Sequence, residues 1–221
     1  IMKILINIFG ISNAGGITVL DKLIKELLIN QSNSYIFVCY KNDAIMKIIN
    51  EYKIYNCFSF EVINHNFFLY RLFFENFVFK KIVNNHSIDL IYNFSGSTQF
   101  FINIPQVTKV HNLSLYSKKL DEAYSTNSLF ILWIKQVFLK RIVFKTMLNR
   151  SRHIEIQSSH VRDGLLDFID TKEKLFYLKS DVDISNDVFL KPKNYNFSKK
   201  IKFLYIVGPH FEHLHKNLTD F

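Results

Sequence analysis

Cysteine, proline, glycine and tryptophan are all scarce in this sequence, and each shortage narrows the class of protein. The 221 residues include two cysteines, three prolines, six glycines and one tryptophan. Cys39 and Cys57 have neither a Cys-x-x-Cys spacing nor a Cys/His zinc spacing, so no disulfide framework or zinc ribbon is indicated. Both lie in apolar runs typical of strands, which favours two buried thiols.

Long uninterrupted apolar runs are also missing. The first apolar stretch, residues 2–9, is short, contains Asn7 and is not followed by a small-residue cleavage site. The stretch 67–83 is rich in aromatic residues, but four charged side chains interrupt it, so a membrane-spanning helix is not predicted there. We therefore predict a first core strand near residue 3 and a cytoplasmic protein.

Acidic residues are absent from one long stretch, although the overall composition is that of a globular domain. Hydrophobic residues make up 48% of the chain and charged residues 21%, which is enough to build a sizeable core. The net charge is +9, and residues 123–154 contain no Asp or Glu. No groove-reading motif accompanies this excess, so nucleic acid is not expected as a partner. The basic residues of the stretch are Lys135, Lys140, Arg141, Lys145, Arg150 and Arg152.

Strand-like and helix-like segments alternate along the first 180 residues. Asn42 or Asp43 is the expected N-cap of the second helix. Alternation of apolar strands with helices predicts a parallel sheet covered on both faces. We therefore predict an α/β fold, a Rossmann-like doubly wound parallel sheet, over residues 1–180. The predicted strands are 3–9, 34–40, 57–63, 88–94, 106–111 and 153–159, and the predicted helices are 16–30, 43–52, 67–85 and 127–149.

The amino-acid composition of the sequence changes after residue 180. Residues 181–200 are polar and contain Pro192, which is typical of a linker between domains. Residues 201–208 then form a new apolar run that ends in glycine. We expect residues 201–221 to begin a second α/β domain that this chain leaves incomplete.

The segment Gly10–Gly16, with the sequence GISNAGG, follows the first predicted strand, where many α/β proteins hold a phosphate. A P-loop would continue with Lys and Ser or Thr, whereas Gly16 and Ile17 stand there. Ser12 replaces the second glycine of the dinucleotide fingerprint, so NTP hydrolysis and dinucleotide binding are both disfavoured. Two interpretations stay open: Gly15 and Gly16 let the backbone approach a ligand closely, or they only permit a tight turn.

Other predicted strands also end in polar residues, and the carboxyl ends of parallel strands meet at one edge of a sheet. His111 ends the fifth predicted strand and can act as a hydrogen-bond donor, acid or base near neutral pH. Asn112 follows it. Ser95 follows the fourth strand and either lines the same cleft or belongs to an ordinary turn. Residues 210–215 hold three histidines without zinc-helix spacing or a cysteine, so no metal site is expected.

The order of these motifs resembles the retaining GT-B glycosyltransferases, the family that includes sucrose synthase and many bacterial polysaccharide and lipopolysaccharide transferases. Residues 13–27 resemble the family's glycine loop and first helix. Residues 88–94 and 104–114 resemble its fourth strand and the strand that ends in a histidine. Residues 153–168 resemble its strand followed by serine and helix. Residues 201–221 resemble the first strand and lysine-bearing loop of the nucleotide-sugar domain.

The resemblance implies a glycosyltransferase and a role for each matching residue. Gly15 and Gly16 would approach the diphosphate of a nucleotide-sugar donor. His111 would face the transferred sugar or the acceptor, and Lys216 would neutralise the leaving diphosphate. Asn112 stands where the family often has Asp.

The same resemblance implies the partners and the setting of the reaction. The acceptor would be a growing glycan, lipid-linked at the cytoplasmic membrane, in bacterial surface polysaccharide synthesis such as that of lipopolysaccharide or O antigen. No metal or other cofactor is implied, because the nucleotide sugar is a co-substrate. The family's acidic C-terminal motif would lie beyond Phe221, so we expect residues 1–221 alone to be inactive. A non-catalytic interaction or remnant module on half of the fold is the alternative.

A membrane surface is the remaining predicted partner. Residues 129–153 mix Trp133 and several large apolar residues with basic residues and no acid. This pattern fits either a core helix with a solvated basic edge or a helix lying on an anionic membrane. We predict peripheral, salt-sensitive binding through Lys140, Arg141 and Lys145.

Overall fold

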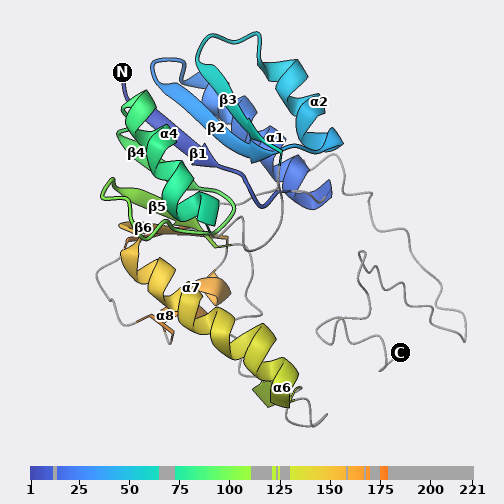
Figure 1. Ribbon diagram of the computed structural model, residues 1–221, viewed down its shortest axis with the longest axis vertical. Helices are drawn as coiled ribbons and strands as arrows, with labels where there is room; N and C mark the ends of the chain where they lie inside the picture. Colours follow the sequence, from blue (N-terminus) through green and yellow to red (C-terminus); the bar gives the residue numbers. More distant parts are fainter. Residues whose placement is uncertain are drawn as a thin grey trace, which may run out of the picture.

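The described part of the chain forms one parallel sheet with helices on both faces (Figure 1). The computed structural model describes residues 1–11, 14–64, 73–110, 121–122, 124, 130–157, 159–166, 168–169 and 175–178. The strand order is β3-β2-β1-β4-β5-β6-β7, and every neighbouring pair is parallel. This confirms the predicted doubly wound α/β fold. The strands are β1 Lys3–Asn7, β2 Ser34–Tyr40, β3 Phe58–Ile63, β4 Leu90–Asn93, β5 Gln106–Lys109, β6 His153–Ile156 and β7 Leu175–Leu178.

The helices connect these strands as the sequence pattern predicts, with two local irregularities. α2 (Asp43–Tyr52) is capped by Asn42, whose Oδ1 accepts a 2.9 Å hydrogen bond from the Ile45 amide, which confirms the predicted cap. The π-turns η1 and η3 each continue directly into an α-helix, which rotates the later side chains relative to the earlier ones. The other helical segments are α1 Ala14–Ile29, η1 Phe74–Val78, α4 Phe79–His86, α6 Phe130–Trp133, η3 Ile134–Phe138, α7 Leu139–Arg150 and α8 Ser159–Leu166.

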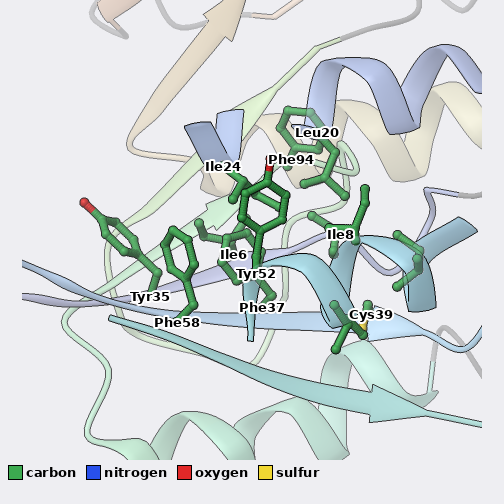
Figure 2. Close-up of a cluster of buried hydrophobic side chains, with 13 residues drawn as sticks. Ile6, Ile8, Leu20, Ile24, Tyr35, Phe37, Cys39, Tyr52, Phe58 and Phe94 are labelled. Carbon is green, nitrogen blue, oxygen red and sulfur yellow. The ribbon is translucent and has the colours of Figure 1, made fainter. Parts of the chain in front are cut away.

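Alternate residues of the central strands bury opposite faces of the sheet, because successive side chains of a strand point to opposite sides. Ile6 and Phe37 pack under α1 and α2 in the cluster that Figure 2 shows, together with Leu20 and Ile24 of α1. Leu5, one residue earlier, packs on the other face beneath η1 and α4. Burial on both faces explains the near-continuous apolar composition of β1 and β2.

A third cluster covers the β5–β6 half of the sheet. Leu148 of α7 packs with Ile154 of β6, and Val161 and Leu165 of α8 complete the cluster. α7 thus buries its C-terminal part, while its N-terminal extension through α6 leads away from the sheet (Figure 1).

α1 and α2 are joined by a polar contact as well as by the core. Asp21 accepts hydrogen bonds from Tyr52 Oη at 2.6 Å and from Lys25 Nζ at 2.6 Å. Burial acts to raise the pKa of the Asp21 carboxyl, but the hydrogen bonds from Lys25 and Tyr52 together lower it below its ordinary value. Burial, followed by the hydrogen bond to Asp21, raises the pKa of the Tyr52 phenol.

The boundaries predicted for the linker, 181–200, and for the start of the second domain, 201–221, lie outside the residues that the structure describes. The last described element is β7, a strand that the sequence analysis did not predict.

Candidate functional site

The strand order places a topological switch point between β1 and β4. From β1 the chain proceeds outward to β2 and β3, whereas from β4 it proceeds the other way to β5, β6 and β7. In doubly wound sheets the loops at such a point diverge and leave a crevice at the carboxyl ends of the strands. The glycine segment 10–16 leaves the end of β1, and the segment 94–97 leaves the end of β4.

Gly15 and Gly16 lie inside the first turn of α1, which begins at Ala14 and not at residue 16 as predicted. A methyl group on Gly16 would lie 3.2 Å from Cγ2 of Ile11, so close packing in the turn accounts for that glycine. A methyl group on Gly15 would meet no described atom within 4 Å, and the φ angle of Gly15 lies outside the left-handed region. Neither packing nor backbone conformation in the described structure requires glycine at position 15.

The beginning of α1 suits an anion. The first amides of any helix have no acceptor within the helix, and the helix dipole places partial positive charge there. No acidic side chain occupies the first turn of α1 to offset it. A small residue with open space at Gly15 would let a phosphate come close to these amides.

Ser95 lies just after β4, on the other side of the switch point. Its amide donates a 3.0 Å hydrogen bond to the Asn7 carbonyl at the end of β1, so the two strand ends are joined directly. Its hydroxyl lies 3.4 Å from that of Ser97. The next residue, Gly96, has a φ of 83° and donates to the Asn93 carbonyl, so a tight turn is also present here. Both sequence interpretations of Ser95 are therefore compatible with its position.

A buried polar network joins the ends of β1 and β4 to η1. Glu75 of η1 is 2% exposed, and its Oε1 accepts hydrogen bonds from Ser97 Oγ at 2.6 Å and from Asn7 Nδ2 at 3.2 Å. Asn7 Oδ1 in turn accepts from the Phe9 amide at 3.1 Å. This chain of contacts links η1 to the start of the glycine segment. Buried polar groups with such partners fix loop geometry, because breaking one contact leaves another group unsatisfied.

A buried ion pair lies near the ends of the neighbouring strands. Lys109 Nζ of β5 is 2.6 Å from Glu155 Oε1 of β6, and the two side chains are 3% and 10% exposed. Tyr92 Oη donates a 2.6 Å hydrogen bond to the other carboxylate oxygen. Lys109 Nζ also lies 5.6 Å from the ring centre of Phe94, within the range of a cation–π contact.

Three predicted site residues are not placed. His111, Asn112 and Lys216 lie outside the described residues. The described chain reaches Val110, whose amide donates to the Glu155 carbonyl at 2.9 Å. Of the predicted set, the structure describes Gly15 and Gly16 in the first turn of α1 and Ser95 just after β4.

Comparison with known proteins gives a distant structural similarity. The sequence matches no protein-family model, and no curated protein matches it. Among solved structures, a glycosyltransferase from Rickettsia africae ESF-5 is similar to this chain, with a TM-score of 0.44 and 13% sequence identity. The alignment covers 80% of this chain and 43% of that one, so this chain spans less than half of that protein's length. Such a similarity assigns no role to any residue.

The predicted membrane-surface residues differ in their environments. Lys140 is exposed at the start of α7, and Lys145 is half-buried. Arg141 donates two 2.8 Å hydrogen bonds to the carboxylate of Asp121, which also accepts from Trp133 Nε1 at 2.6 Å. Arg141 therefore forms an intramolecular ion pair that holds Asp121 against the helix.

The described residues were predicted to hold neither a metal site nor a membrane-spanning helix. No three His, Cys, Asp or Glu side chains of the described residues are grouped as a metal site requires, and the histidines at 210–215 lie outside those residues. No helix in the described part of the chain is long and apolar enough to cross a bilayer.

The sequence analysis missed the most deeply buried polar groups. It treated Glu75 only as an interruption of an apolar helix and assigned nothing to Lys109 or Glu155. A charged residue flanked by strand residues, as Lys109 and Glu155 are, is a usable signal. Their pairing depends on β5 lying next to β6, which the sequence does not specify residue by residue.

Proposed function

We propose that this chain is the acceptor-side half of a retaining GT-B glycosyltransferase. The protein would transfer a sugar from a nucleotide-sugar donor to a growing glycan that is linked to a lipid. The reaction would be a step in bacterial surface polysaccharide synthesis. The observation that carries the proposal is Gly15, a glycine in the first turn of α1 that no described neighbour requires. It lies at the switch point of the sheet, where doubly wound folds bind ligands. The flanking sequence lacks the P-loop lysine and the dinucleotide fingerprint, which leaves a diphosphate of another kind.

The reaction assigns a task to each part of the site. The bond between the anomeric carbon and the diphosphate oxygen breaks, and the nucleoside diphosphate leaves with both electrons. An acceptor hydroxyl forms the new bond to the anomeric carbon and passes its proton to an oxygen of the departing diphosphate. The α1 amides beside Gly15 and Gly16, with Lys216 from the second domain, would stabilise the charge of the leaving diphosphate. His111 would hydrogen-bond the transferred sugar or the acceptor, and the scheme uses no metal.

Ser95 and Asn112 would line the acceptor side of the cleft. The contact of Ser95 with the Asn7 carbonyl supports this placement, because it brings the β4 loop against the base of the glycine segment. Glu75 would hold both loops through Asn7 and Ser97.

The test is a screen of UDP-, GDP- and dTDP-sugars with glycan acceptors, in which donor consumption and product mass are both followed. We expect turnover when residues 201–221 continue into a complete donor domain, and none from residues 1–221 alone. His111→Ala in the complete protein should reduce turnover on the order of a hundredfold or more, with the fold intact. Turnover by residues 1–221 alone would contradict a cleft shared by two domains. A complete protein that binds partner proteins but consumes no donor would favour the non-catalytic alternative.

We also propose that α7 rests on the inner face of an anionic membrane. Leu139, Ile142 and Val143 share one side of the helix and are 50%, 50% and 43% exposed, whereas Phe144 and Leu148 lie on the opposite side and pack in the core. The helix thus has two apolar sides, and the core of the described structure covers only one. Lys140 and Lys145 flank the exposed side, as in a helix that lies in a membrane interface.

Vesicle binding tests this second proposal. Lys140→Glu with Lys145→Glu should remove about 1 kcal/mol of attraction for each lost positive charge and abolish salt-sensitive binding to anionic vesicles. Arg141 is left unchanged because its reversal would also break the contact with Asp121. Lys47→Glu on the exposed surface of α2 is the matched control. Equal binding to neutral and anionic vesicles would contradict the proposal.

A further inference from the structure

A recess with two arginines lies at the edge of the sheet opposite the glycine segment. It has a volume of about 340 Å³ and is lined by residues 102–106 together with Arg150 and Arg152. Gln106 is the first residue of β5, and Arg152 directly precedes β6, so the recess lies at the amino ends of these strands. The glycine segment follows the carboxyl end of β1. The recess is therefore separate from the proposed sugar-transfer cleft.

Buried contacts hold the backbone of both arginines. Ser151, between them, is 2% exposed, and its hydroxyl lies 2.7 Å from that of Thr108 and 2.9 Å from that of Thr98. The Arg152 amide donates a 2.8 Å hydrogen bond to the Gln106 carbonyl. Both arginines are themselves exposed. The two guanidinium groups thus extend from a fixed base, which lowers the entropy lost when they bind a ligand.

The facing wall of the recess is also braced. Gln106 Nε2 donates to the Gln99 carbonyl at 2.9 Å, and Gln106 Oε1 accepts from the Gln99 amide at 3.0 Å. Gln106 Oε1 also accepts from Asn93 Nδ2 at 3.0 Å. These contacts close the loop between β4 and β5 on itself, so the concave surface does not depend on a ligand for its shape.

The charge of the recess is unbalanced. Among the described residues, no acidic side chain lines it. Asp89, at the same edge, accepts a 2.8 Å hydrogen bond at its Oδ2 from the Lys3 amide of β1. Arg150 in the last turn of α7 also complements the negative end of the helix dipole, but Arg152 lies beyond the helix and gains nothing from it. A recess with two permanent positive charges and no lining acid suits an anion with several oxygens.

We propose that this recess binds a phosphate group through Arg150 and Arg152. Paired guanidinium groups match the oxygens of a phosphate, because each can donate two parallel N–H bonds. The phosphate is that of a soluble ester or of a lipid headgroup. The lipid source would place the recess at the membrane, since Arg150 shares the exposed side of α7 with Leu139 and Val143.

Titration of the 221-residue protein with inorganic phosphate tests the site. The arginine Nε–H signals in an NMR spectrum should shift and saturate, and Arg150→Gln or Arg152→Gln should each weaken binding about tenfold. Arg162→Gln is the matched control, because it removes an exposed guanidinium of α8 that is paired with Asp163 outside the recess. Thermal melting of each variant checks that the fold is unchanged. Absence of saturable binding, or equal loss in the control variant, would overturn the proposal.

Vesicles then separate the two sources. If the ligand is a lipid headgroup, vesicles of phosphatidic acid in phosphatidylcholine should bind the protein, and Arg150→Gln should weaken that binding. Inorganic phosphate should then compete with the vesicles. When the ligand is a soluble ester, Arg150→Gln should reduce phosphate binding and leave vesicle binding unchanged. Either result supports the recess as a phosphate site, whereas unchanged phosphate binding in Arg150→Gln with Arg152→Gln rejects it.

Discussion

Replacing Gly15 by alanine should separate the stability of the protein from its ability to bind a diphosphate. The added methyl group would meet no described atom within 4 Å, and the backbone at Gly15 is not in the left-handed region. Alanine at such a position restricts the unfolded chain and stabilises the fold by about 0.4–1 kcal/mol. For a domain of this size that corresponds to an increase in melting temperature of about 1–4 °C.

The neighbouring glycine supplies the control. A methyl group on Gly16 would lie 3.2 Å from Cγ2 and 3.6 Å from Cδ1 of Ile11, so the side chain of Ile11 would have to shift. Gly16→Ala should therefore not show the increase in the free energy of unfolding that Gly15→Ala shows, although the two substitutions are chemically identical. Urea denaturation followed by circular dichroism measures both, and a Gly15→Ala protein less stable than Gly16→Ala would refute the packing argument.

Ligand binding should respond in the opposite direction. In the proposed cleft the new methyl group at Gly15 would hold the diphosphate away from the first amides of α1. Hydrogen bonds to a charged group contribute about 1.5–3 kcal/mol each, so loss of one bond should weaken binding about tenfold or more. Calorimetric titration with UDP, GDP and dTDP measures this effect. A Gly15→Ala protein that binds the preferred nucleotide with unchanged affinity would show that this glycine has no role in binding.

Other predictions concern the buried polar groups and the thiols. Lys109→Met leaves Glu155 buried without its cation, so it should destabilise the fold by about 3–5 kcal/mol in urea denaturation. Adding Glu155→Leu should restore part of the lost stability. A loss below about 1 kcal/mol for Lys109→Met would contradict the assigned role of the ion pair. Burial raises the pKa of the Cys39 thiol to about 12, so at pH 8 a thiol reagent should modify the half-buried Cys57 and spare Cys39 in the native protein; equal rates at both would show that Cys39 is accessible. Folding lowers the pKa of Asp21, so the ionised carboxylate stabilises the folded protein relative to the Asp21→Asn variant. This stabilisation is present above about pH 4 and is lost as the pH falls through the pKa of Asp21 in the folded protein. A stability difference between the two proteins that does not change between about pH 2 and pH 7 would contradict the lowered pKa.

The sequence predicted the β1–β3 half of the sheet well, because its strands carry a strong signal. β2 coincides with the predicted segment 34–40, and α2 coincides with 43–52 and has the predicted cap. Strands that are buried on both faces must be apolar throughout, and the helices between them show a clear helical period. The alternation predicted a doubly wound sheet, but the sequence analysis did not place the switch point, because that requires the strand order.

The parts that the sequence missed depend on contacts between distant residues. β7 is a four-residue strand at the edge of the sheet, and so short a run has little periodicity to detect. The ion pair of Lys109 with Glu155 spans 46 positions, and that of Arg141 with Asp121 spans 20. Arg141 looked like a surface charge in the sequence because only the folded chain brings Asp121 to it.

The most direct test of the central claim, a diphosphate site at the switch point, is a titration of glycine-labelled protein with nucleotide sugars. The chain has only six glycines, so a spectrum of [¹⁵N]glycine protein shows few signals, and Gly15→Ala identifies one of them. A UDP-, GDP- or dTDP-sugar should shift the amide signals of Gly15 and Gly16 in a saturable way. Gly164 of α8 should stay unchanged. If no nucleotide sugar moves the Gly15 and Gly16 signals, or if Gly164 moves equally, the switch point does not hold the donor diphosphate and the proposed function is wrong.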